Sequence, residues 1–155
     1  MTESTIKGHE PTPLKLHAAD AQDLQIISSM LQDSLIIPQD ITYFATEKRF
    51  AILLNRFCWE KSPAIDNEEK RGYRIHTGCI FNNINQVQQK GLDDARSQQI
   101  LNLLAIEWHA TEQAIILSFS GNISVRLITD KINCYVKDFG DPWPTCWQPQ
   151  HNKNK

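Results

Sequence analysis

The sequence predicts an α+β fold: an N-terminal helix, six to seven antiparallel strands that form a bent sheet or barrel, and an amphipathic C-terminal helix. Two changes in the spacing of apolar residues predict it. These residues recur at helical spacing near residues 20–33, alternate with a period of two from Leu35 to Leu127, and return to helical spacing after Thr129.

Length and composition fit one globular domain. The chain has 155 residues, of which 41% are hydrophobic and 22% charged, and this is ordinary usage for a single domain. We expect a flexible arm at 1–13, a globular domain at 14–149 and a polar tail at 150–155. The formal net charge of −2 is atypical of proteins that bind nucleic acid or an anionic membrane.

The chain is expected to be cytoplasmic. No apolar run approaches the ~20 residues that span a bilayer, and residues 1–17 do not have the pattern of a secretory signal. The four cysteines are therefore expected to remain reduced thiols.

The first helix is predicted at about residues 20–33. Asp20 can cap it by accepting from the backbone N–H three residues on, and Asp23 lies in the positively polarised first turn. One face is expected to be buried, and it carries Leu24, Ile27, Met30 and Leu31.

Strands are predicted where the period is two. The best-defined segments are 50–59, 73–81, 100–108, 115–119 and 123–127, with shorter ones near 35–37 and 41–45. Segment 50–59 is apolar on both faces, which is typical of a central strand. Parity along the strands predicts a buried core that includes Ile52, Leu54, Ile75, Leu117 and Val125.

A second helix is predicted after Thr129, which can act as its N-cap, and Gly140 suits the position that follows a helix. The apolar stripe has the spacing i, i+3, i+4 and i+7 and consists of Ile132, Tyr135, Val136 and Phe139. This order of elements resembles a pleckstrin-homology-like barrel, in which a terminal helix plugs one end. An open antiparallel sheet packed by two helices is the alternative.

The sequence favours a protein without a metal, a cofactor or a catalytic nucleophile. The four cysteines are too far apart for the paired ligands that are typical of structural zinc. Strand parity turns His76 away from Cys79, so these two residues are not expected to form a local dyad. We therefore expect a protein that is not an enzyme.

Basic residues form the first candidate binding group. Arg74 and His76 begin one predicted strand, and Arg56 of a neighbouring strand can join them in an anion pocket. The structural alternative is a solvated strand face beside an acidic loop.

Tryptophans form the second candidate group. Trp59 ends one predicted strand, and Trp143 and Trp147 lie in a proline-rich segment. Indoles are enriched in interfaces because they bury a large area at low entropic cost. The alternative is that Trp143 folds back and caps the open end of the sheet core.

Several segments resemble a small alphaproteobacterial family of proteins of unknown function, about 140–155 residues long. The likeness covers about 14–149, and its most specific part is the run from Arg49 to Glu60. The other segments are 31–33, 101–106, 123–127 and 140–143. The resemblance implies a bacterial, cytoplasmic, single-domain protein and carries no catalytic or binding role with it.

The sequence leaves the function unknown and orders three hypotheses. The first is a non-catalytic interaction module that binds a protein or peptide, or a second copy of itself. The second is a small-molecule or anion-binding protein that uses the basic strand face. The third is a Cys-dependent enzyme built on Cys58 or Cys79.

Overall fold

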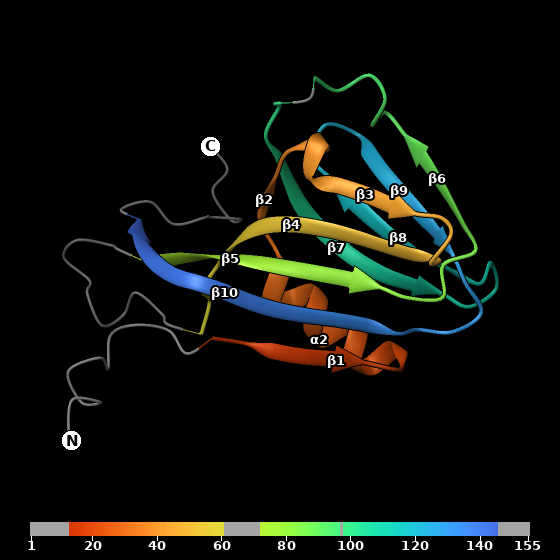
Figure 1. Cartoon of the computed structure of the whole chain (residues 1–155), viewed down its shortest axis with the longest axis horizontal. Coiled ribbons are helices and arrows are strands. Elements are labelled where there is room, and N and C mark those ends of the chain that lie inside the picture. Colours follow the sequence, from red (N-terminus) through yellow and green to blue (C-terminus); the bar gives the residue numbers. More distant parts are fainter. Residues whose placement is uncertain (1–12, 61–71, 97, 146–155) are drawn as a thin grey trace, which may run out of the picture.

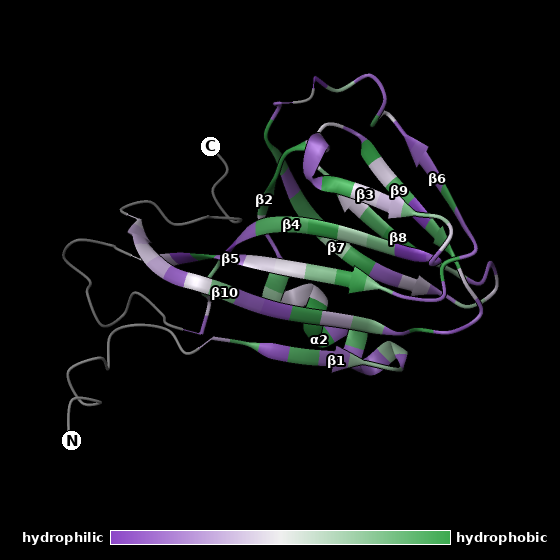
Figure 2. Cartoon of the chain, in the orientation of Figure 1, coloured by the Kyte–Doolittle hydropathy of each residue, from purple (hydrophilic) through white to green (hydrophobic). Residues whose placement is uncertain are grey.

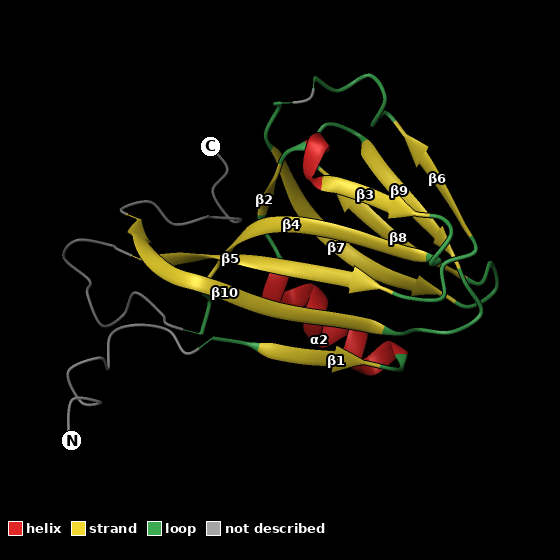
Figure 3. Ribbon diagram, in the orientation of Figure 1, coloured by secondary structure: helices red, strands yellow, loops and turns green. Residues whose placement is uncertain are grey.

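The computed structural model describes residues 13–60, 72–96 and 98–145, and within them it contains one α-helix and one antiparallel sheet of ten strands (Figures 1 and 3). The elements are β1 (Lys15–Ala18), α2 (Ala21–Leu31), β2 (Leu35–Ile36), the 3-10 helix η2 (Pro38–Asp40), β3 (Ile41–Phe44), β4 (Arg49–Phe57), β5 (Gly72–Phe81), β6 (Gln86–Lys90), β7 (Leu101–His109), β8 (Ala114–Phe119), β9 (Ile123–Ile128) and β10 (Cys134–Thr145). No helix in these ranges is long and apolar enough to span a bilayer.

The sheet bends into two halves at β2. Its strand order is β1-β10-β5-β4-β2-β7-β8-β9-β6, and β3 also pairs with β4. Leu35 of β2 pairs with Asn55 of β4 on one side and with Asn102 of β7 on the other. A front half of β3, β4, β5, β10 and β1 therefore faces a back half of β6 to β9 (Figure 1).

The hydrophobic core fills the space between the two halves and α2. The Asp20 side chain caps the helix by accepting from the Asp23 N–H at 2.8 Å, as the sequence predicts. Ser28 accepts from the backbone N–H of Ile106 at 2.9 Å and joins α2 to β7. The core residues predicted from strand parity are all buried: Ile52, Leu54, Ile75, Leu117 and Val125.

The predicted fold class is wrong, because the sheet has more strands than expected and the second helix is a strand. From Cys134 onward, the residues predicted to form that helix belong to β10, which pairs with both β1 and β5, while Ile132 lies in the turn before this strand. Along β10 the buried residues Cys134, Val136 and Asp138 alternate with exposed ones. Asp138 interrupts the alternation of apolar residues that would have indicated a strand. The outward Tyr135 and Phe139, together with Ile132 and Val136, happen to have the spacing of a helical stripe.

The predicted cap residues of that helix serve other turns. The Thr129 hydroxyl donates to the Lys131 carbonyl at 2.8 Å and so forms a tight turn before β10. Gly140 has a φ of 76° and lies where the pairing of β10 with β5 shifts register. A left-handed glycine thus makes a bulge in a strand here instead of ending a helix.

The edge strand β6 is polar and exposed along most of its length (Figure 2). Its sequence is QVQQK, and a polar edge that ends in lysine is a common protection against unwanted strand pairing. The large exposed apolar side chains of the front half lie instead on the outward face of its strands, where Leu53 and Phe139 are found.

Adjacent leucines on β4 test which face is the core. Leu54 is buried and Leu53 is half exposed. We expect Leu54→Ala to lower the free energy of unfolding by about 2–5 kcal/mol, because it leaves a cavity. Leu53→Ala is the matched control and should change it by at most about 0.5 kcal/mol. Equal losses in urea melts of the two variants would contradict this assignment.

Candidate functional site

A buried cluster of charged side chains lies on the inner face of the front half. Arg56 of β4 donates to both oxygens of Asp138 on β10, from Nε to Oδ1 at 2.9 Å and from Nη2 to Oδ2 at 2.7 Å. Glu60 accepts two more hydrogen bonds from Arg56, at 3.1 and 2.8 Å. Thr77 of β5 and the backbone N–H of Leu14 also donate to Asp138, at 2.7 and 2.8 Å. The cluster joins three adjacent strands.

This cluster is stable in its ionised form. Burial alone would raise the pKa of Asp138, but the hydrogen bonds from Arg56, Leu14 and Thr77 lower it below its ordinary value. Burial opposes the charge on Arg56, and the hydrogen bonds to Asp138 and Glu60 outweigh it, so the pKa of Arg56 is raised. Arg56 is therefore an internal counter-ion, enclosed away from any incoming anion.

Arg74 and Trp59 are also held by contacts within the fold. Arg74 is buried, and its Nη1 donates to the Asn55 carbonyl at 3.0 Å. Its guanidinium carbon lies 5.6 Å from the centre of the Phe57 ring, and burial lowers the pKa of Arg74. The Trp59 indole N–H donates to the Gln32 carbonyl at 3.0 Å and fastens the end of α2 to the end of β4.

His76 and Trp143 lie together on the outward face of the front half. Their ring centres are 4.8 Å apart, and on the other side His76 stacks with Phe139 at 5.8 Å and 20°. Trp143 is half-buried and lies opposite Arg74 in the register of β10 with β5. Trp143 therefore belongs, with His76 and Phe139, to a row of rings on the outward face and does not cap the end of the core. Trp147 lies outside the described residues.

A groove of about 420 Å³ adjoins this row. Its walls include Leu53, His76 and Phe139 on the front strands and Ile100 beside the start of β7. Leu53 and Ile100 expose 50% and 65% of their surface, so both present apolar surface to solvent at the groove. Asp40 is the charged residue of the lining. The groove is mostly apolar, with one acidic end.

A glycine lies between the two exposed apolar side chains. Gly78 of β5 pairs with Leu53 of β4 on one side and with Lys137 of β10 on the other. A Cβ atom built on Gly78 would be 3.8 Å from Leu53 Cδ2 and 3.9 Å from Phe139 Cε1. A Cβ atom would meet both side chains at ordinary contact distances, so the bare backbone of Gly78 leaves a notch between Leu53 and Phe139, which line the groove.

Cys58 and Cys79 are poor nucleophiles. Burial raises the pKa of Cys58 to about 12. The hydrogen bond with Cys134, whose Sγ lies 3.7 Å away, and burial raise the pKa of Cys79. Attack requires the thiolate, which these environments disfavour at neutral pH. Cys146 lies outside the described residues.

No group of three or more His, Cys, Asp or Glu side chains within 13–60, 72–96 and 98–145 is placed to hold a metal ion. His76 is exposed and Cys79 buried on the same strand, so the two side chains point to opposite faces, as strand parity predicts.

Of the six residues singled out from the sequence, the structure brings the rings of His76 and Trp143 into contact on the outward face, and the buried Arg74 lies opposite Trp143 in the strand pairing. Arg56, Trp59 and Arg74 have internal partners, and Trp147 lies outside the described residues. The sequence reasoning missed Leu53, Gly78 and Phe139 as parts of a site. A glycine inside a strand pattern is a recognised signal of close approach by another group, and it could have drawn attention to Gly78.

Comparison with known protein families identifies the chain. A model of the family described as "Protein of unknown function (DUF2948)" matches residues 14–151. The chain belongs to this family. The resemblance to a family of unknown function is confirmed, and the DUF2948 description gives no specific activity. No curated protein matches the chain, and no solved structure matches it.

The buried carboxylate predicts a pH-dependent stability. Because folding lowers the pKa of Asp138, the unfolded chain binds this proton more readily, and the stabilisation is present above the unfolded value of about 3.9. It is lost as the pH falls through the folded-state pKa. Asp138→Asn should lower the free energy of unfolding by about 3–5 kcal/mol at pH 7, and its difference from the unsubstituted chain should shrink below about pH 4.

The measurement is a series of urea melts between pH 7 and pH 3. Asp141→Asn is the matched control, because Asp141 is an exposed carboxylate on the same strand, and it should follow the unsubstituted chain. A deficit in Asp138→Asn that stays constant down to pH 3 would contradict the ionised pair.

Proposed function

We propose that this DUF2948 domain is a non-catalytic binding module whose outward groove holds a bulky apolar side chain of a peptide or protein partner. The observation that carries the proposal is the apolar groove, whose lining includes the exposed Leu53 and Phe139, with the bare backbone of Gly78 beside these two side chains. Ligand sites are typically concave, mostly apolar and furnished with a few polar groups. This groove has that composition, with Asn55, His76 and Asp40 as its polar groups.

The anion-binding hypothesis has less support. It depends on Arg56 and Arg74, and both guanidinium groups are buried and hydrogen-bonded within the fold. Binding an anion there would break contacts that compensate the burial of these charges. The exposed imidazole of His76 is the part of the predicted basic face that still meets solvent.

The enzyme hypothesis also has less support. The Cys58 and Cys79 thiols are buried and protonated. Neither lies on the outward face that carries the groove.

We propose that the module works in the cytoplasm, where buried thiols remain reduced.

Peptide selection with paired surface variants tests the proposal. A random-peptide library displayed on phage is selected on the immobilised full-length chain, and the affinity of the enriched peptides is measured by titration. Leu53→Glu should weaken their binding at least about 30-fold, because a charge replaces an anchor contact worth about 2 kcal/mol. Ile26→Glu is the matched control, since Ile26 on α2 is 53% exposed and outside the groove, and it should leave affinity unchanged.

The unsubstituted chain and both variants are also melted, to show that a loss of binding is not a loss of folding. Failure to enrich any peptide, or an equal loss of affinity in the two variants, would contradict the proposal. So would a dimer of the unsubstituted chain, seen by sedimentation, that Leu53→Glu converts to monomer, because the groove would then hold a second copy.

A further inference from the structure

We infer that the groove selects a peptide in which an acidic residue stands next to a bulky apolar one. The inference rests on the proposed function and adds the chemistry of the partner. It combines three features of the outward face: the Gly78 notch, a pair of lysines beside it and the acidic residue at the opposite end.

The notch accounts for the apolar residue. Gly78 weakens a central strand, because it has no side chain to pack and loses more backbone freedom on folding than other residues. The space above it accepts a Cβ at ordinary contact distances, so packing within the fold does not demand glycine there. Glycine at such a position commonly lets another group approach the backbone closely. An apolar side chain seated on Gly78 would contact Leu53 and Phe139.

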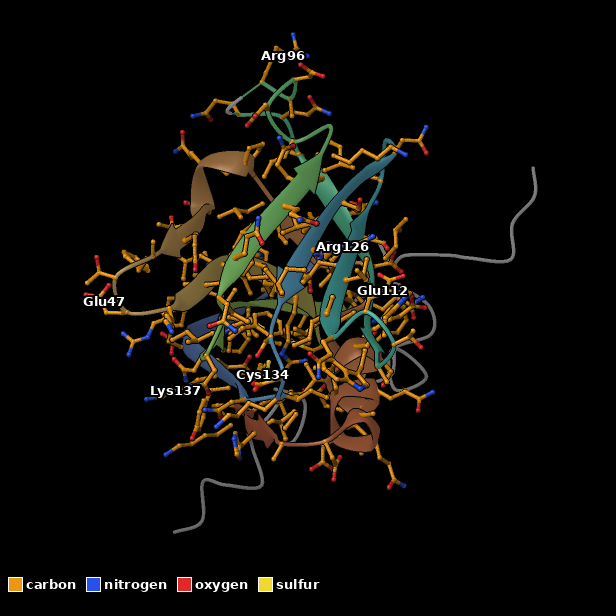
Figure 4. All side chains as sticks on the ribbon, turned by 90° about the vertical axis from the view of Figure 1, so that its right-hand side faces the viewer. Glu47, Arg96, Glu112, Arg126, Cys134 and Lys137 are labelled. Carbon is orange, nitrogen blue, oxygen red and sulfur yellow. The ribbon has the colours of Figure 1, made fainter. Side chains whose placement is uncertain are left out.

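The lysine pair accounts for the acidic residue. Lys137 lies directly opposite Gly78, and Lys15 lies directly opposite Lys137 on β1. Both lysines are exposed, and within the described residues neither forms an ion pair. Figure 4 shows Lys137 pointing away from the sheet, while Cys134 of the same strand lies inside. Like charges directly opposed across two strands are destabilising, and a carboxylate between them would relieve the repulsion.

Asp40 gives the peptide a direction. Leu53, Gly78, Lys137 and Lys15 occupy one register row across four strands. Asp40 lines the groove and directly precedes β3, whose Ile41 pairs with Ile52 of β4. Because β5, β10 and β1 lie on the other side of β4, Asp40 is on the side of Leu53 away from the lysines. A carboxylate would be repelled by Asp40 and attracted by the lysines, so the acidic residue should lie toward β1 and β10.

The test uses the peptides that the phage selection enriches and two further variants of the full-length chain. The enriched sequences should place Asp or Glu beside Leu, Ile, Met, Phe or Trp, and their affinity should fall as salt is raised. Gly78→Val fills the notch and should weaken binding at least about tenfold with an unchanged or higher melting temperature. Lys137→Glu should weaken an acidic peptide about five- to tenfold.

A charge swap makes the result independent of folding. A peptide whose acidic residue is replaced by lysine should bind Lys137→Glu better than it binds the unsubstituted chain. Two results would overturn this inference and leave the groove as a binding site: enriched peptides that are apolar without an acidic neighbour, or a lysine peptide that binds Lys137→Glu no better than it binds the unsubstituted chain. Full affinity of the peptides for Gly78→Val would show that the apolar side chain does not sit on Gly78. Absence of any enriched peptide would instead overturn the proposed function.

Discussion

The bidentate pair between Arg56 and Asp138 is the constraint on which the front half of the molecule depends. Arg56 is on β4 and Asp138 on β10, and between these two strands lies β5, whose Thr77 also donates to Asp138. Two buried charges would be costly to leave unpaired. The pair is therefore satisfied when these three strands keep one register.

That register also determines the outward face. Successive side chains of a strand point to opposite faces, and a slip of one residue would exchange the two faces. With Arg56, Thr77 and Asp138 directed inward, their neighbours on the same strands are directed outward. Leu53, His76, Gly78 and Phe139 occupy the outward positions. The polar cluster beneath the sheet thus fixes the residues that form the groove above it.

Much of the fold could be predicted from local spacing. The Asp20-capped helix and most of the strands follow from the period of apolar residues, and the core of Ile52, Leu54 and Ile75 follows from parity. β10 could not be predicted in this way. Its inward Asp138 looks like a surface residue in the sequence, because the partner that compensates its charge is 82 positions away. The β-branched and aromatic residues around it would have favoured a strand.

The candidate site was predictable only in part, for a related reason. His76 is a polar residue within a predicted strand and Trp143 is an indole within a proline-rich segment, so both are noticeable in the sequence, and their rings are in contact in the structure. Arg56 and Arg74 looked like ligand-binding groups because the sequence does not show the carboxylates and carbonyls that surround them. The row from Leu53 to Lys15 is created by pairing between distant strands, so no local pattern reveals it.

The most direct test of the account is to map where an enriched peptide contacts the folded chain. Backbone and methyl NMR spectra of the full-length protein, recorded during titration with the peptide, report this residue by residue. We expect the largest shift changes at Leu53, Gly78 and Phe139, with little change at Ile26 on α2 or along β6. Changes centred on β6, on α2 or on the back half of the sheet would contradict the account.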